Sequence, residues 1–191
     1  MTKGDIKAQV LECIEKRKPC YFNMKYETKS YLYYPLLMND RFFLGAVEND
    51  FELDGYTIRR FRDVTAVKIR DSLCNLIDIQ EGLIDQIVIP ALDLTSWESI
   101  FHSLKKMAIN IIIEDERDPD DREYADAGFY IGHIEKVCRS HLWFRHFDAD
   151  GIWQDEAYKI MYSEITSLSF QRRYVDIFSK YLPPLPDNVK G

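Results

Sequence analysis

Histidine and carboxylate side chains, the types that bind metals or transfer protons, gather in one stretch of the second half of the chain. The members are His141, His146, Asp148, Asp150, Asp155 and Glu156. A calcium loop of the EF type needs acidic residues at alternate positions, Gly at the sixth position and Glu at the twelfth. Counted from Asp148, Gly151 is the fourth residue and Lys159 is the twelfth. The stretch is therefore predicted to be a hairpin loop between strands, with no metal.

The other candidate catalytic side chains stand apart from one another. His102 falls on the polar side of a predicted helix, and His133 lies among apolar residues of a predicted strand. Neither has a Cys or Ser at a spacing that indicates a nucleophile activated by a base. The sequence also contains no phosphate-binding loop, nucleophile elbow or zinc-protease motif. We therefore predict that the protein is not an enzyme and uses no cofactor.

Arginines interleaved with aromatic residues are the best nucleic-acid signal in the sequence. The candidate RNA-binding residues are Arg59, Arg60 and Arg62 in one cluster and Arg172, Arg173 and Tyr174 in another. Such mixtures stack bases and hold phosphates. In the alternative interpretation, arginines on a strand face water or pair with nearby acids. The net charge of −7 disfavours binding driven by the overall field of the protein.

Acidic side chains concentrate between residues 114 and 123, which include seven acids and two arginines. Residues 91–191 carry a net charge of −6, whereas residues 1–90 carry −1. We expect a solvated connection at residues 114–123. The alternative is a docking site for a basic partner through Asp118, Asp120 and Asp121, as in an acidic inhibitor or immunity-type protein.

A short pattern occurs twice, which indicates an internal duplication. Residues 42–48 match residues 129–135 around Phe-x-x-Gly, residues 56–61 match 142–147, and residues 63–69 match 164–170. Each half is predicted to begin with a helix, the first at Asp5 and the second at Thr95 or Ser96.

Five strands are expected after each of these helices. The predicted strands are 20–26, 30–37, 41–50, 56–61 and 64–70 in the first half and 110–114, 129–137, 141–147, 158–161 and 165–171 in the second. Turn residues separate them, at 53–55 in the first half and 148–151 in the second. The spacing of Leu76, Ile79, Leu83 and Ile87 predicts a helix between the halves, and residues 174–182 are expected to form a short closing helix.

The order of a helix, a strand, a bent strand with Phe-x-x-Gly and further short strands resembles an Sm-like barrel. The segments Tyr130–Glu135 and Ile160–Thr166 resemble the bacterial Sm-like RNA chaperones, and the whole chain is similar to tandem Sm-like bacterial proteins with no assigned activity. In that resemblance Gly45 and Gly132 are barrel corners, and Phe42 and Phe129 are structural. The Lys-His pair of the RNA chaperones is replaced here by Tyr162 and Ser163. RNA binding is therefore not carried over.

These observations predict a mainly β protein with helices (α+β), built as two tandem Sm-like small β-barrels, each preceded by an N-terminal helix. The expected domains are residues 1–90, which include a connecting segment, and residues 91–191. The predicted function is non-enzymatic binding or adaptor activity, through a protein partner that adds a strand to a barrel edge. RNA is the alternative partner, and open edges also allow a homo-oligomer. Scattered cysteines and the lack of an apolar span predict a cytoplasmic protein without a membrane contact.

Overall fold

The computed structural model describes residues 1–115 and 128–186. The chain divides into two compact units, Met1–Pro90 (unit 1) and Ala91–Gly191 (unit 2). In each unit one helix is followed by a run of strands, and the strands pair antiparallel. The prediction of a mainly β protein with helices is confirmed. The described strands form open sheets, and no closed barrel is found among them.

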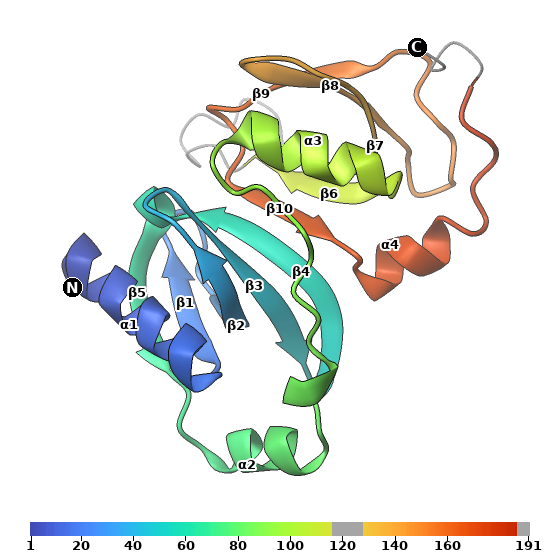
Figure 1. Cartoon of the computed structure of the whole chain (residues 1–191). Coiled ribbons are helices and arrows are strands. Elements are labelled where there is room, and N and C mark those ends of the chain that lie inside the picture. The colour runs from blue at the N-terminus through green and yellow to red at the C-terminus, as the bar shows by residue number, and fades with distance from the viewer. Residues whose placement is uncertain (116–127, 187–191) are drawn as a thin grey trace. The chain divides into compact units, whose positions relative to one another are not determined.

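Unit 1 contains one helix, five strands and then a connector, which we define as residues 71–90. Its elements are α1 (Lys3–Lys16), β1 (Cys20–Met24), β2 (Ser30–Met38), β3 (Phe42–Asn49), β4 (Glu52–Arg60), η1 (Phe61–Asp63), β5 (Val64–Ile69), α2 (Leu73–Gln80) and η2 (Ile84–Gln86). The strands pair in the order β5-β1-β2-β3-β4. The helix α1 contacts β2 and β5, so it lies across one face of this sheet (Figure 1).

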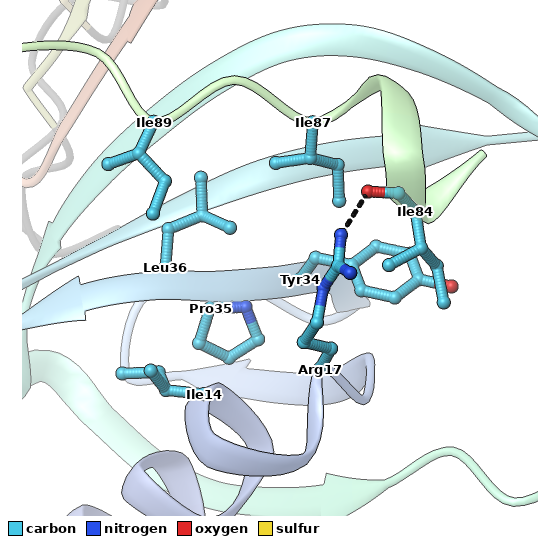
Figure 2. A pocket seen from close by; sticks show the side chains of 8 residues that line it. All are labelled: Ile14, Arg17, Tyr34, Pro35, Leu36, Ile84, Ile87 and Ile89. Carbon is cyan, nitrogen blue, oxygen red and sulfur yellow. Dashed lines mark hydrogen bonds between the residues drawn. The ribbon is translucent and has the colours of Figure 1, made fainter. Parts of the chain in front are cut away.

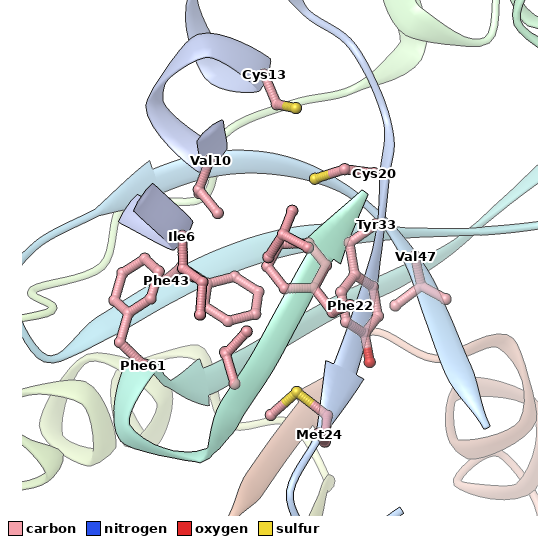
Figure 3. Close-up of a cluster of buried hydrophobic side chains, with 12 residues drawn as sticks. Ile6, Val10, Cys13, Cys20, Phe22, Met24, Tyr33, Phe43, Val47 and Phe61 are labelled. Carbon is pink, nitrogen blue, oxygen red and sulfur yellow. The ribbon is translucent and has the colours of Figure 1, made fainter. Parts of the chain in front are cut away.

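The helix α1 begins with a capping box, because Thr2 and Asp5 each bond the backbone N–H of the other. It ends at Arg17, whose left-handed φ of 50° stops the helix before β1 begins. Its inward face comprises Ile6, Val10 and Cys13, all of which are buried. These residues meet a cluster of aromatic side chains from the strands (Figure 3). Phe22 and Phe43 stack there, with ring centroids 4.4 Å apart.

The opposite face of the unit 1 sheet is covered by the connector. Leu83 is buried against Tyr34 and Ala46, and Ile84 and Ile87 pack around the same cluster. Both faces of this sheet are therefore occupied, which explains why β3 is buried at almost every position rather than at alternate ones.

The hairpin between β3 and β4 turns at a different place from the one that the sequence suggests. Gly55 was the expected turn residue, but it lies within β4, where its φ of 69° accompanies a bulge opposite β3. The chain instead reverses at Asp50 and Phe51, which both have positive φ as a tight two-residue hairpin requires. The backbone N–H of Phe51 donates to Glu48 Oε1 at 2.9 Å, which stabilises this less usual turn.

Unit 2 repeats the order of one helix followed by five strands. Its elements are α3 (Trp97–Met107), β6 (Ile111–Glu114), β7 (Phe129–Val137), β8 (His141–His146), β9 (Tyr158–Met161), β10 (Ser167–Phe170) and α4 (Arg173–Phe178). The strands pair in the order β10-β6-β7-β8-β9. The helix α3 starts at Ser96, whose hydroxyl accepts from the N–H of Ser99, and it contacts β7. Its buried residues are Trp97, Ile100, Phe101 and Leu104.

The order of strand pairing is the same in both units, but the matched Phe-x-x-Gly segments do not occupy equivalent strands. Gly45 lies on β3, the third strand of unit 1, whereas Gly132 lies on β7, the second strand of unit 2. The sequence match of residues 42–48 with 129–135 is therefore displaced by one strand. Phe129, expected to be structural, is also 57% exposed, whereas Phe42 is buried.

Both glycines nevertheless serve the same pair of strands, the second and the third of each unit. A Cβ on Gly45 would lie 2.9 Å from the Cβ of Tyr33 on β2, and one on Gly132 would lie 2.0 Å from the carbonyl oxygen of Arg145 on β8. Each second strand also contains a bulge, at Pro35 to Leu37 and at Ile134 to Lys136. The glycine and the bulge together let the second and third strands of each unit curve and approach each other closely. The glycines are close-approach positions in open sheets rather than corners of a closed barrel.

Candidate functional site

The first arginine cluster lies at the end of β4 and is mostly internal. The side chain of Arg59 is only 3% exposed, forms an ion pair with Glu27 and places its guanidinium carbon 4.9 Å from the ring centroid of Tyr31. Arg60 is also buried and donates to Asp63 at 2.5 Å. Only Arg62 is exposed, with its Nε 3.8 Å from the Asp63 carboxylate. All three arginines thus pair with nearby acids, and the RNA-binding role of the cluster stays a prediction.

The second cluster lies at the start of α4 and is more accessible. Arg172 is the N-cap, Arg173 is the first helical residue, and Tyr174 is exposed. Tyr174 lines a cavity of about 610 Å³ in unit 2. The other lining residues are Gly128, Phe129, Tyr130, Ile131, His146, Phe147, Asp148, Ala149 and Gln154. This open cavity combines aromatic faces with amide, carboxylate and imidazole groups.

His146 forms part of the wall of this unit 2 cavity. Its ring meets that of Tyr130 edge to face, with centroids 5.6 Å apart, and Tyr130 stacks on Tyr158. The Nδ1 of His146 is buried and accepts no hydrogen bond within the described part of the chain. Burial lowers the pKa of this imidazole below its usual value of 6.5, so the ring is neutral at pH 7. Sequence spacing gave no sign of this environment.

The segment after β8, predicted to be a hairpin loop, forms a turn. Asp148 Oδ1 accepts hydrogen bonds from the backbone N–H groups of Asp150 and Ile152, and Gly151 has a φ of 78°. Its carboxylate thus fixes the local backbone. In residues 1–115 and 128–186, no group of three or more His, Cys, Asp or Glu side chains could hold a metal ion.

The acidic docking residues Asp118, Asp120 and Asp121 lie outside the described residues. The inhibitor or immunity-type interpretation stays a prediction.

Strands β5 and β9 each lie at an edge of the sheet of their own unit. Both β5 and β9 have a single neighbour, β1 and β8 respectively, among the described strands. The N–H of Tyr162, just after β9, donates to the carbonyl of Ser140. Every second residue before it, Ile160 and Tyr158, therefore also directs its backbone N–H and C=O toward β8. Because successive residues of an antiparallel strand turn their backbone groups to opposite sides, Lys159 and Met161 direct theirs away from β8. The same alternation directs the backbone groups of Val67 and Ile69 away from β1.

A smaller apolar cavity of about 190 Å³ lies between α1, β2 and the connector in unit 1 (Figure 2). Its lining residues are Ile14, Arg17, Tyr34, Pro35, Leu36, Ile84, Ile87 and Ile89. Arg17 closes one side, where its Nη2 donates to the carbonyl of Ile84 at 2.7 Å. Engineered apolar cavities of about 150 Å³ bind benzene, so this one has room for one small apolar group.

The connector differs from its predicted form. Helix α2 ends at Gln80, and Gly82 with a φ of 68° redirects the chain before Leu83. Leu76 and Ile79, expected on a buried stripe, are exposed. The buried residue of α2 is Asp78 instead.

None of the described helices is long and apolar enough to cross a membrane. No protein-family model, no curated protein and no solved structure matches the chain.

Proposed function

We propose that the protein is a non-enzymatic binding or adaptor protein that adds a β-strand of a partner protein to the outer edge of β9. The observation that carries this proposal is the pairing of β9 with β8 alone, which leaves the outward N–H and C=O of Lys159 and the outward N–H of Met161 without a strand neighbour in the described chain. The C=O of Met161 accepts from the N–H of Glu164 in the turn that follows β9. Such an edge is a template for a further strand.

The β9 edge is also accessible at its side chains. Lys159 and Tyr158 are exposed, so an incoming strand meets a positive charge and an aromatic ring. A lysine on an edge disfavours self-association and favours a partner strand with an acidic residue opposite it. The same kind of edge on β5 offers a second place for a strand of a partner or of another copy of the chain.

In this proposal both units are Sm-like, since each consists of a helix followed by five antiparallel strands with a bulged second strand. Cytoplasmic location belongs to the same proposal. It is supported by Cys13, Cys20, Cys74 and Cys138, which are all free thiols.

The test is a pair of substitutions at one exposed residue of β9. Lys159→Pro removes the outward N–H and the charge, whereas Lys159→Ala removes the charge alone. Strand-forming peptides selected from a random displayed library against the protein are the probe. We expect binding about tenfold weaker to the Pro variant than to the Ala variant, because one strand hydrogen bond is lost and the ring obstructs pairing. Equal binding by the two variants would contradict the proposal.

RNA is the second candidate partner, and the position of Tyr174 favours it. Exposed Tyr174 and Phe129 line one cavity, and two arginines precede Tyr174 on the chain. Aromatic faces beside arginines suit single-stranded nucleic acid. A single-stranded oligouridine should bind with an affinity that falls as salt rises and that is reduced in Tyr174→Ala and in Arg172→Ala/Arg173→Ala. Tyr181→Ala, at another exposed tyrosine, is the matched control. Absence of binding at low salt would exclude this candidate.

A further inference from the structure

Helix α2 is turned so that its apolar side faces solvent. Leu73, Leu76 and Ile79 recur every third residue and are 69%, 57% and 58% exposed. We call these three residues the α2 ridge. On the other side of the helix Asp78 is completely buried. A helix that only stabilised the fold would bury the leucines and expose the carboxylate, so the orientation of α2 is the reverse of the usual one.

A buried network holds α2 in this orientation. Asp78 accepts a hydrogen bond from the hydroxyl of Tyr34 at 2.6 Å and pairs with Arg70. The Arg70 guanidinium also pairs with Glu48 at 2.9 Å and donates from Nε to Asn75 at 2.6 Å. Burial and the Asp78 carboxylate raise the pKa of Tyr34, which keeps its hydroxyl as a donor.

Rolling α2 to cover the ridge would separate these groups. Arg70 would then keep Glu48 but lose Asp78 and Asn75, and the hydroxyl of Tyr34 would lose its acceptor. Separating a buried ion pair is strongly destabilising, so the network opposes this rotation. The buried network therefore keeps the α2 ridge exposed to solvent. Exposed apolar residues held in this way mark a contact surface rather than a mobile segment.

The charges around the ridge have one sign. Residues 71–104 contain no Lys or Arg. Asp71 precedes α2, Glu81 follows it, and both are exposed, as is Asp85 beyond them. Arg17 forms an ion pair with Asp85, with its Nη1 3.5 Å from the carboxylate. A second copy of the chain would bring the same acids against this rim and would be repelled.

We propose that the α2 ridge binds an amphipathic helix of a partner protein that carries Leu or Ile on one face and Lys or Arg on both flanks. A ridge of residues three apart on a helix packs best into the groove between side chains of another helix, and basic flanks complement Asp71 and Glu81. This contact uses neither strand edge and is independent of strand addition at β9.

The probe is a synthetic helical peptide with leucines on one face and lysines on the others, compared with a peptide of the same composition in which the leucines are spread around the helix. Fluorescence anisotropy measures both dissociation constants at low and physiological salt. We expect the amphipathic peptide to bind at least about tenfold more tightly, because only it can bury the ridge as one face. Equal affinities for the two peptides would overturn the proposal, because they would show that binding depends on charge alone.

Two pairs of variants locate the contact. Leu73→Ser/Leu76→Ser should weaken binding of the amphipathic peptide at least about tenfold, whereas Leu11→Ser, at an exposed leucine of α1, should not. Asp71→Asn/Glu81→Gln should weaken it and flatten its salt dependence, whereas Glu156→Gln in unit 2 should leave both unchanged. Unchanged binding by the ridge variant would contradict the proposal.

Two further readouts separate this contact from its alternatives. Lys159→Pro, which tests strand addition, should bind the helical peptide as the unmodified protein does. Sedimentation of the unmodified protein and of Leu73→Ser/Leu76→Ser should show the same oligomeric state. Loss of a dimer in the ridge variant would overturn the proposal in favour of a second copy as the occupant.

Discussion

Helices α2 and α3 both carry large apolar residues at helical spacing, yet they bury opposite kinds of side chain. In α3, Ile100, Phe101 and Leu104 face inward and are fully buried. In α2, a carboxylate faces inward and the leucines face solvent. The difference teaches that spacing identifies a helix but not its inner face. In α2 that face is selected by an arginine on another part of the chain.

The largest expected effect comes from removing this arginine. Arg70→Ala should lower the free energy of unfolding by about 3–5 kcal/mol, because it leaves the carboxylates of Glu48 and Asp78 buried without their cation. Urea unfolding measures the change. Arg62→Ala is the control, since the Arg62 side chain is 64% exposed and its loss should change stability by less than about 0.5 kcal/mol. Equal effects of the two substitutions would show that the network does not hold α2.

The next prediction compares the two helices directly. Ile100→Ala in α3 should cost about 2–5 kcal/mol, because it opens a cavity in a filled core. Leu76→Ala in α2 should change the free energy of unfolding by less than about 0.5 kcal/mol, since its side chain is exposed. Both values come from the same denaturant measurement. A large cost at Leu76 would mean that the α2 ridge is buried in the folded protein.

Apolar spacing predicted α1, α3 and most strands because these elements bury one regular face. Capping residues placed the helix starts well, at Thr2 and Ser96, within a few residues of the expected positions. The same reasoning failed for the connector, since the partners that bury Asp78 lie outside α2. Arg70 is eight residues earlier and Tyr34, on β2, is 44 residues earlier. Charge pairing of this kind is a tertiary property that overrides helical periodicity.

The candidate arginines show the same limit. The sequence left open whether Arg59 binds RNA, faces water or pairs with an acid, whereas in the structure the sheet of unit 1 is covered on both faces and Arg59 is paired with Glu27. Period-two patterns distinguish the buried from the solvated side only when one side is solvated. At the start of α4, by contrast, Tyr174 is exposed beside a cavity that sequence spacing does not reveal.

The comparison extends from the helices to the sheets through two glycines that serve equivalent strand pairs. Gly132→Ala should cost about 1–3 kcal/mol, because the new methyl group would meet the backbone carbonyl of Arg145 at 2.0 Å. Gly45→Ala should cost less, since its nearest neighbour is the Cβ of Tyr33 at 2.9 Å. Gly4→Ala on α1 is the control, since its methyl group would meet only the Thr2 hydroxyl, at an ordinary contact distance of 3.7 Å. An equal or greater loss of stability in Gly45→Ala would contradict the prediction that the shorter contact, at Gly132, costs more.

The smallest expected effect distinguishes the units by pH, because all four histidines belong to unit 2. Burial lowers the pKa of both His133 and His146 below 6.5, with the nearby charge of Lys105 contributing at His133. The folded protein therefore binds fewer protons than the unfolded chain just below this pH. The stabilisation is fully present above about pH 6.5 and is lost as the pH falls toward the lowered pKa values.

Urea unfolding between about pH 5 and 7 should show this decline, and His133→Gln/His146→Gln should flatten it. His102→Gln, at an exposed residue of α3, should leave the decline in place. If the double variant keeps the full decline, the groups responsible are not these two histidines.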